Sequence, residues 1–404
     1  MTTKINNEHK KLNVPNLRFP EFLGEWEEHK LEDITAEIGD GIHATPIYDD
    51  NGTFYFVNGN NISEYGITIT ATTQTVTEEE ALRNNASALN SYSILLSING
   101  TVGNVALYKN ESIMLGKSAC YINVSSNINR NYIFYYLMMP KCQFYFTSEL
   151  TGTTIKNLSL KSIRKTKVLL PNANEQSKIA RLFDAINERI ATQNKIIEDL
   201  KKLKCAIIEK HYRQAKLHKY KICDLGVPFS VGSLSKEDLS EEGHECILYG
   251  ELFTTYDCVI NEVKSHTNKI ANTTLSQKGD LLFPSSTTVD AVSLISPSVI
   301  DTPNVILGGD MFGIHIDKKF NAYYLSYYIN LIARKKLAIY AKGSTIIHLH
   351  YKDIAKAQLL LPDLCEQDKI AKCMMAEDAK INVEEQLLTK LEKQKQYLLR
   401  QMFI

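Results

Sequence analysis

The sequence contains few residue groupings that could perform catalysis. His348 and His350 alternate along one stretch and could bind a metal ion, but no third ligand follows nearby. A pair of side chains on one strand face is therefore the simpler interpretation. The segment from Pro362 to Lys369 is faintly similar to a nuclease motif. The same segment opens a predicted helix, where Asp363 and Glu366 would stabilise the positive N-terminal end.

Other catalytic signatures are missing from the sequence. No GxxxxGK[ST] phosphate loop, no GxGxxG turn after a predicted strand and no HExxH zinc motif occurs. The Asn-Pro-Pro-aromatic and Asp-Pro-Pro-aromatic motifs of amino-methyltransferases are also missing. We therefore expect a non-catalytic protein that has no catalytic residue, no metal site and no cofactor of its own.

Polar loops in the first half fit nucleic-acid recognition better than catalysis. Gly100 to Gly103 and Thr151 to Thr154 are turn sequences whose backbone N–H groups and hydroxyls can hold phosphates. Asn58, Asn60 and Asn61 could reach base edges, because a carboxamide can make a bidentate pair with adenine. Each motif is weak alone, since loops of this composition are usually only loops. Their value lies in their shared proximity to a basic segment.

Charge is segregated within each half of a chain whose net charge is zero. Residues 83–165 carry 9 Lys and Arg against 2 Asp and Glu, and residues 332–361 carry 6 against 1. A basic segment with a polar Gly/Ser/Thr loop, found in both halves, fits phosphate contacts better than an ordinary solvated face. The side chains that we predict to contact DNA are Asn58, Asn60, Asn61, Thr101, Lys117, Thr151, Thr153, Thr154, Lys156, Lys161, Ser286, Thr287, Lys342, Ser344, Thr345, His348 and Lys352.

A long heptad helix, which occurs twice, must position these loops. Apolar residues between Glu175 and His211 recur at alternating steps of four and three, which makes a seam along one helix face. The motif Glu175-Gln176-x-Lys178-Ile179-Ala180 returns as Glu366-Gln367-x-Lys369-Ile370-Ala371, an offset of 191 (366 minus 175). One such helix usually lies on its own domain, but two copies favour an intramolecular coiled coil. The residues that we expect to pair the helices and bind partner subunits are Ile179, Phe183, Ile186, Ile190, Ile197, Leu200, Lys204, Ile370, Glu377, Ile381, Leu388, Leu391 and Leu398.

Short β-type runs and turns precede each helix, and the second half repeats the plan of the first. Thr151 to Ile155 aligns with Lys342 to Ile346, and Leu169-Leu170-Pro171 aligns with Leu360-Leu361-Pro362. The sequence predicts an α/β fold with two tandem mixed α/β domains, separated by two long antiparallel coiled-coil helices in an internal pseudo-two-fold repeat. The predicted parts are a flexible tail (1–15), a first recognition domain (16–171), a central helix (172–215), a second recognition domain (216–362) and a C-terminal helix (363–404).

Composition indicates a globular protein of the cytoplasm. The eight cysteines form no CxxC pair, and no secretory segment or run of 18 apolar residues occurs. We therefore expect a cytoplasmic protein with reduced thiols.

The whole layout resembles the specificity subunit of a Type I restriction–modification system. The similarity rests on Leu17-Arg18-Phe19-Pro20, on Trp26 to Ile34, on Thr151 to Leu158, and on Leu170-Pro171 followed by Glu175 to Ala180, with the second copy of that helix. It implies two target recognition domains that read a bipartite, non-palindromic site in double-stranded DNA. It also implies two modification subunits, which use S-adenosylmethionine to methylate adenine, and restriction subunits, which use ATP and Mg. The resemblance implies a bacterial protein that is associated with the nucleoid through DNA, and it implies no membrane partner.

Two rival functions remain open from the residues alone. A self-contained DNA methyltransferase with atypical motifs would bind S-adenosylmethionine in the isolated chain. A coiled-coil adaptor would bind only proteins and would fail to bind DNA at any salt concentration. The helix seam also makes a specific prediction, because pairing Ile179 with Met402 places Lys204 opposite Glu377, and one such ion pair can set the helix register.

Overall fold

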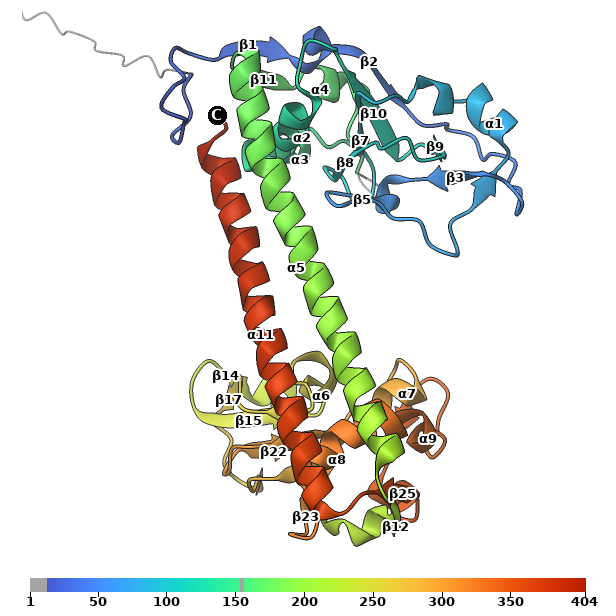
Figure 1. Ribbon diagram of the computed structural model, residues 1–404, viewed down its shortest axis with the longest axis vertical. Coiled ribbons are helices and arrows are strands. Elements are labelled where there is room, and N and C mark those ends of the chain that lie inside the picture. The colour runs from blue at the N-terminus through green and yellow to red at the C-terminus, as the bar shows by residue number, and fades with distance from the viewer. Residues whose placement is uncertain (1–12, 153–155) are drawn as a thin grey trace, which may run out of the picture. The chain divides into compact units, whose positions relative to one another are not determined.

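The computed structural model describes residues 13–152 and 156–404, which form two compact units (Figure 1). Unit 1 contains the chain up to Lys195 together with Gln386–Ile404, and unit 2 contains Ile196–Glu385. Two long helices, α5 (Ala173–Gln214) and α11 (Leu364–Gln401), each contribute one part to either unit. Most of the flexible tail that we expected over 1–15 lies outside the described residues.

Unit 1 is built on a four-stranded antiparallel sheet in the order β2-β10-β7-β8. A second sheet, β6-β3-β9, contains the parallel pair β3/β9, and β1 pairs with β11 to close the unit before α5. Helix α2 is rich in aromatic residues, and its side chains from Tyr132 to Leu137 are all buried. The bounds are β1 Glu27–Lys30, β2 Thr35–Asp40, β3 Phe54–Val57, β4 Ile62–Ser63, β5 Gly66–Ile67, β6 Thr75–Val76, α1 Glu78–Arg83, β7 Ser93–Ser97, β8 Val105–Leu107, β9 Ile113–Leu115, β10 Ala119–Val124, α2 Arg130–Met138, α3 Pro140–Ser148, α4 Leu160–Arg164 and β11 Lys167–Leu170.

Unit 2 repeats this topology. Its sheet β13-β23-β19-β21-β16 has the same order as β2-β10-β7-β8 with one strand added, and β15/β22 is parallel like β3/β9. Strand β12 pairs with β25 as β1 pairs with β11. The bounds are β12 His218–Lys221, β13 Gly226–Ser230, β14 Leu239–Ser240, β15 His244–Leu248, α6 Glu251–Thr254, β16 Val259–Ile260, β17 Ser265–Thr267, β18 Thr274–Leu275, β19 Asp280–Pro284, β20 Ser286–Thr287, α7 Ala291–Leu294, β21 Ser298–Ile300, β22 Ile306–Gly308, β23 Met311–Ile316, α8 Ala322–Tyr328, α9 Arg334–Ala338, β24 Ile347–His348, α10 Tyr351–Ile354 and β25 Gln358–Leu361. The predicted duplication of two mixed α/β domains is confirmed.

The repeated Glu-Gln motif has a structural cause. Gln176 donates its amide to the carbonyl oxygen of Pro171 at 2.9 Å and accepts from the backbone N–H of Asn129 at 3.0 Å. Gln367 makes the same two bonds in unit 2, to Pro362 at 2.8 Å and from Asn321 at 3.0 Å. Both glutamines are buried, so each fixes the start of its long helix against the start of an aromatic helix, α2 or α8, by satisfying buried backbone groups.

The two long helices run antiparallel within each unit. In unit 2, Lys204 forms an ion pair with Asp378, and His211 lies 3.3 Å from Glu366. In unit 1, the ring of Phe183 packs against that of Phe403. The predicted partner of Lys204 was therefore wrong by one residue, because the acid that it meets follows Glu377 in the sequence.

The buried row on each helix departs from a strict heptad at the same repeated place. After Lys204 the next buried residue is Ile208 rather than Ile207, and after Lys395 it is Leu399 rather than Leu398. A straight helix has 3.6 residues per turn, so a 3.5-residue seam drifts around it by about 20° per heptad. Ile208 and Leu399 join the cores of the globular parts of their own units. Among the residues predicted to pair the helices, those buried are Ile179, Phe183, Ile190, Ile197, Leu200, Ile370, Ile381 and Leu391, and those partly buried are Ile186, Lys204, Glu377, Leu388 and Leu398.

Candidate DNA-recognition surfaces

Each unit carries the same antiparallel backbone pair where the sequence predicted phosphate or base contacts. Thr151 and Asn157 exchange backbone hydrogen bonds of 3.0 and 2.9 Å, and Lys342 and His348 exchange bonds of 2.9 and 2.7 Å. These two pairs are related by the offset of 191. We call the segments joined by these pairs, 151–152 with 156–157 in unit 1 and 342–348 in unit 2, the recognition hairpins. Thr153 and Thr154 lie outside the described residues.

The turn of the recognition hairpin in unit 2 is exposed to solvent. Ser344 and Thr345 are exposed, and Gly343 has a φ of +119°, a conformation that favours glycine. A Cβ on Gly343 would approach the carbonyl oxygen of Ile346 to 2.1 Å. Glycine therefore allows a turn that exposes the hydroxyl-bearing residues Ser344 and Thr345, whose side chains could contact phosphates.

In unit 1, three predicted segments meet at Gly59. The Thr101 hydroxyl donates to the Gly59 carbonyl oxygen at 2.8 Å, and the Gly59 N–H donates to the Ser118 hydroxyl at 2.9 Å. Ser118 in turn donates to the Asn58 carboxamide at 2.9 Å. Gly59 is buried, and a Cβ there would meet Ser97 Oγ at 2.3 Å, so close packing requires glycine. This contact network holds the turn 58–61 rigidly beside the loop that follows β7.

The three asparagines of this turn consequently have different roles. Asn58 accepts from Ser118, and Asn61 accepts from the Asn58 N–H at 3.0 Å and donates to Thr68, so both side chains build the turn. Asn60 is exposed, and its side chain makes no hydrogen bond to any residue that the structure describes. Lys117 is exposed next to Ser118. Asn60 is therefore the asparagine whose carboxamide is available to a base edge.

In unit 2, the recognition hairpin pairs with the segment that follows β19. Strand β20, made of Ser286 and Thr287, lies antiparallel to β24, which ends at His348. Ser286 is only 7% exposed, whereas His348 is exposed and its ring stacks on that of His350 at 6.1 Å between centroids. In unit 1, Asn99 bridges to Asn157 in the same way. Both units thus bring the loop after an equivalent strand beside the hairpin.

The predicted phosphate partners do not share one electrostatic environment. Lys117, Lys156, Lys161 and Lys352 are exposed. Lys342 is exposed as well, but its ammonium forms an ion pair with Asp353, and hydrogen bonding from this ammonium lowers the pKa of the Asp353 carboxyl. Asp353 therefore competes with any phosphate for Lys342.

The rejected catalytic motifs have structural roles. The Asp363 carboxylate accepts the Glu366 N–H at 2.9 Å and caps α11, as Asn172 accepts the Glu175 N–H at 3.0 Å at the start of α5. Within residues 13–152 and 156–404, no group of three His, Cys, Asp or Glu side chains lies close enough to hold a metal ion. These same ranges contain no helix with the length and apolar character of a membrane span.

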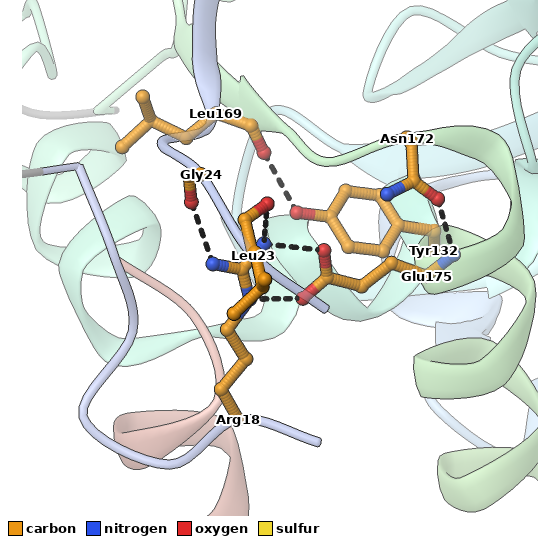
Figure 2. A network of polar contacts seen from close by, with 7 residues as sticks. All are labelled: Arg18, Leu23, Gly24, Tyr132, Leu169, Asn172 and Glu175. Atoms are coloured by element: carbon orange, nitrogen blue, oxygen red, sulfur yellow. Dashed lines mark hydrogen bonds and ion pairs between the residues drawn. The ribbon is translucent and has the colours of Figure 1, made fainter. Parts of the chain in front are cut away.

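Sequence reasoning missed a buried ion pair that ties the N-terminal segment to α5. Arg18 donates from Nε and Nη2 to both carboxylate oxygens of Glu175, at 2.7 and 2.8 Å, and from Nη1 to the Gly24 carbonyl oxygen at 2.6 Å (Figure 2). The Glu175 side chain is fully buried, and its hydrogen bonds to Arg18 raise the pKa of that guanidinium. The repeated Glu366 meets His211 instead, so the repeat itself carried no signal for Arg18.

Comparisons with known proteins agree with this duplicated architecture. The family described as "Type I restriction modification DNA specificity domain" matches residues 24–202 and again 216–393. The chain is 22% identical to a putative type I restriction enzyme MjaX specificity subunit from Methanocaldococcus jannaschii, over 97% of this chain and 96% of that protein.

Two solved structures share the fold. One is the S subunit of a Type I restriction–modification system from M. genitalium, with a TM-score of 0.60, 16% identity and coverage of 97% of this chain and 99% of that chain. The other comes from work on complex assembly and conformational transition of the type I R-M system, with a TM-score of 0.57, 14% identity and coverage of 94% and 97%.

Proposed function

We propose that each unit reads one half of a split DNA site, because the chain belongs to the Type I restriction modification DNA specificity family. Family membership makes the chain the non-catalytic DNA sequence-recognition subunit of a Type I restriction–modification system. The methyltransferase and adaptor alternatives are not favoured. Our proposal concerns the division of reading between the two units and the residues that perform it.

The observation that carries the proposal is the repeated recognition hairpin, set on two units that share topology but not surface chemistry. Unit 1 closes its hairpin with Thr151 and Asn157, and unit 2 uses Lys342 and His348. Because the equivalent positions carry different donors and acceptors, the two hairpins would favour different bases. A non-palindromic, bipartite target in double-stranded DNA is the consequence of one reader on each unit.

Within each unit, the groups divide by chemistry. The exposed lysines and the hairpin N–H groups would hold phosphates and set the register on the duplex. Asn60 in unit 1 and His348 in unit 2 would contact base edges, because both present polar groups that their own fold does not bury. Asn58, Asn61, Thr101 and Ser286 would act by holding these readers in place.

The partners would supply the chemistry that this chain lacks. We propose that α5 and α11 bind two modification subunits, which bring S-adenosylmethionine and methylate adenine, and that restriction subunits add ATP- and Mg-dependent cleavage. The exposed faces of both helices outside the buried seam offer the surface for this contact.

Single substitutions in the reconstituted modification complex test the division. Asn60→Ala should reduce discrimination against wrong bases in the first half-site by about tenfold, which corresponds to about 1.4 kcal/mol, and should leave the second half-site unchanged. His348→Ala should do the reverse. The matched control is Thr68→Ala, an exposed position just outside the turn. If either substitution relaxes both halves equally, the units do not read separately.

A further inference from the structure

The C-terminal helix carries a lysine whose charge is neutralised by the first recognition domain. The Lys395 side chain is only 3% exposed, and its ammonium forms an ion pair with the Glu64 carboxylate. Both residues belong to unit 1, although 331 positions separate them in the sequence. Burying an ammonium without a counter-charge is unfavourable, so this contact constrains both partners.

Glu64 stands on the hairpin that directly continues the turn 58–61. Strands β4 and β5 form this hairpin, and Thr68 N–H returns to the Asn61 carbonyl oxygen at 2.8 Å. Asn104 donates to the Ile62 carbonyl oxygen at 3.0 Å, which fixes one side of the hairpin to the domain. The other side meets α11, where burial chiefly, and then the charges of Glu64 and Glu392, raise the pKa of Tyr65 to about 12.

In unit 2, the corresponding lysine is neutralised by an acid of the long helices themselves. Lys204 is the repeat counterpart of Lys395, and its partner Asp378 belongs to the coiled coil itself. The position in α5 that corresponds to Asp378 is Asn187, a neutral residue that donates to the Tyr135 hydroxyl at 3.0 Å. The coil of unit 1 therefore lacks the acid that neutralises the lysine in unit 2, and the recognition domain provides it.

We propose that Lys395 is a positioning residue for DNA reading in the first half-site. Through Glu64 it holds the β4–β5 hairpin, and through the hairpin it orients the turn that presents Asn60. The C-terminal helix would thus influence what the first domain reads, whereas Lys204 of unit 2 pairs with Asp378 of the coil and lies over the ring of Tyr327 in α8 rather than beside a base-reading turn. The DNA-reading part of this inference rests on the proposed function, but the positioning part does not.

Hydrogen exchange in the full-length chain without DNA tests the positioning alone. Lys395→Met removes the buried charge and keeps a similar shape, so the chain should fold, and Glu64→Gln is a second, independent variant. Both should accelerate exchange of the Asn61 and Thr68 amides about tenfold or more. Lys393→Met, on an exposed position of the same helix, is the matched control and should leave these amides unchanged. Unchanged exchange in both variants overturns the proposal.

Methylation by the reconstituted complex tests the consequence for reading. Lys395→Met should lower discrimination against wrong bases in the first half-site about tenfold, with discrimination in the second half-site within about twofold of the wild type. The double variant Glu64→Lys with Lys395→Glu, which reverses the ion pair, should recover most of the lost discrimination. If Lys395→Met acted through a general loss of stability, this reversal would not restore discrimination. Equal losses in both half-sites, or faster exchange with unaltered discrimination in the first, overturn the proposal.

Discussion

The ion pair between Lys204 and Asp378 predicts an asymmetric response to single substitutions. The Lys204 side chain is 13% exposed and that of Asp378 is 31% exposed, and the Tyr327 hydroxyl donates to Asp378 at 2.5 Å. Removing the acid leaves a nearly buried ammonium that lies over the Tyr327 ring, 4.9 Å from its centroid. Removing the lysine leaves the Asp378 carboxylate, which still accepts the hydrogen bond from the Tyr327 hydroxyl and is partly exposed to water.

This difference sets the expected magnitudes. Breaking a fully buried pair costs about 3–5 kcal/mol, and the partial exposure of Asp378 lowers this to about 2–3 kcal/mol for Asp378→Leu. Lys204→Met should cost about 1–2 kcal/mol, because one charged hydrogen bond is lost while another remains. The double variant should lie within about 1 kcal/mol of the wild type, since an apolar pair can replace a buried ion pair. The coupling free energy, which is the summed cost of the two single variants less the cost of the double variant, is then about 4 kcal/mol.

Urea-dependent hydrogen exchange of residues 196–214 measures the free energy of unfolding of unit 2 itself. The matched control is Lys201 with Glu385, an ion pair on the same two helices whose side chains are 58% and 46% exposed. Its coupling should be below about 0.5 kcal/mol. A coupling for Lys204 and Asp378 no larger than that of the control would mean that burial does not strengthen this pair.

Particular contacts support three further predictions. Asp353→Asn should free Lys342 for phosphate, which strengthens DNA binding by the complex and steepens its salt dependence by about one counterion. Burial raises the pKa of the Asp280 carboxyl in the folded state, so the folded state holds this proton more tightly than the unfolded state does. The resulting contribution to the free energy of unfolding is fully present below the unfolded pKa of about 4. It is lost as pH rises through the folded pKa. Asp280→Asn should therefore gain stability relative to the wild type as pH rises from about 4 to about 7 in thermal unfolding. The fragment 1–215 should dimerise in sedimentation, and Glu64→Gln should weaken the dimer, because Glu64 would meet the partner's seam lysine.

Each of these predictions has a contrary result. An unchanged salt slope in Asp353→Asn would mean that Lys342 does not contact phosphate, with Lys342→Gln as the variant that should flatten the slope. A relative stability of Asp280→Asn that falls as pH rises over the same range would mean that the ionised carboxylate is the favoured form. A fragment that stays monomeric at high concentration would mean that the two helices are not interchangeable.

The duplication could be predicted from the sequence because the repeated contacts are local. Gln176 and Gln367 bond to a proline carbonyl five residues back, so the motif and its geometry repeat together. The contacts that escaped prediction join segments without a repeat. Arg18 meets Glu175 across 157 positions, and Glu64 meets Lys395 across 331 positions.

The wrong prediction of Glu377 as the partner of Lys204 has a related physical origin. An antiparallel seam fixes which turns face each other, but side chains of neighbouring residues point in directions about 100° apart on a helix. Lys204 consequently reaches Asp378, and Glu377 keeps one buried carboxylate oxygen that has no hydrogen-bond partner in the described part of the chain. Spacing predicts the facing turns, whereas packing of the globular domains selects the residue.

Replacement of one recognition domain would show whether each unit reads its own half-site. The segment 216–361 would be exchanged for the matching segment of a related specificity subunit, and methylated adenines would be mapped across a genome that expresses the modification complex. We expect a split motif in which one half changes and the other half is retained. A continuous motif, or a change in both halves together, would contradict separate reading by the two units.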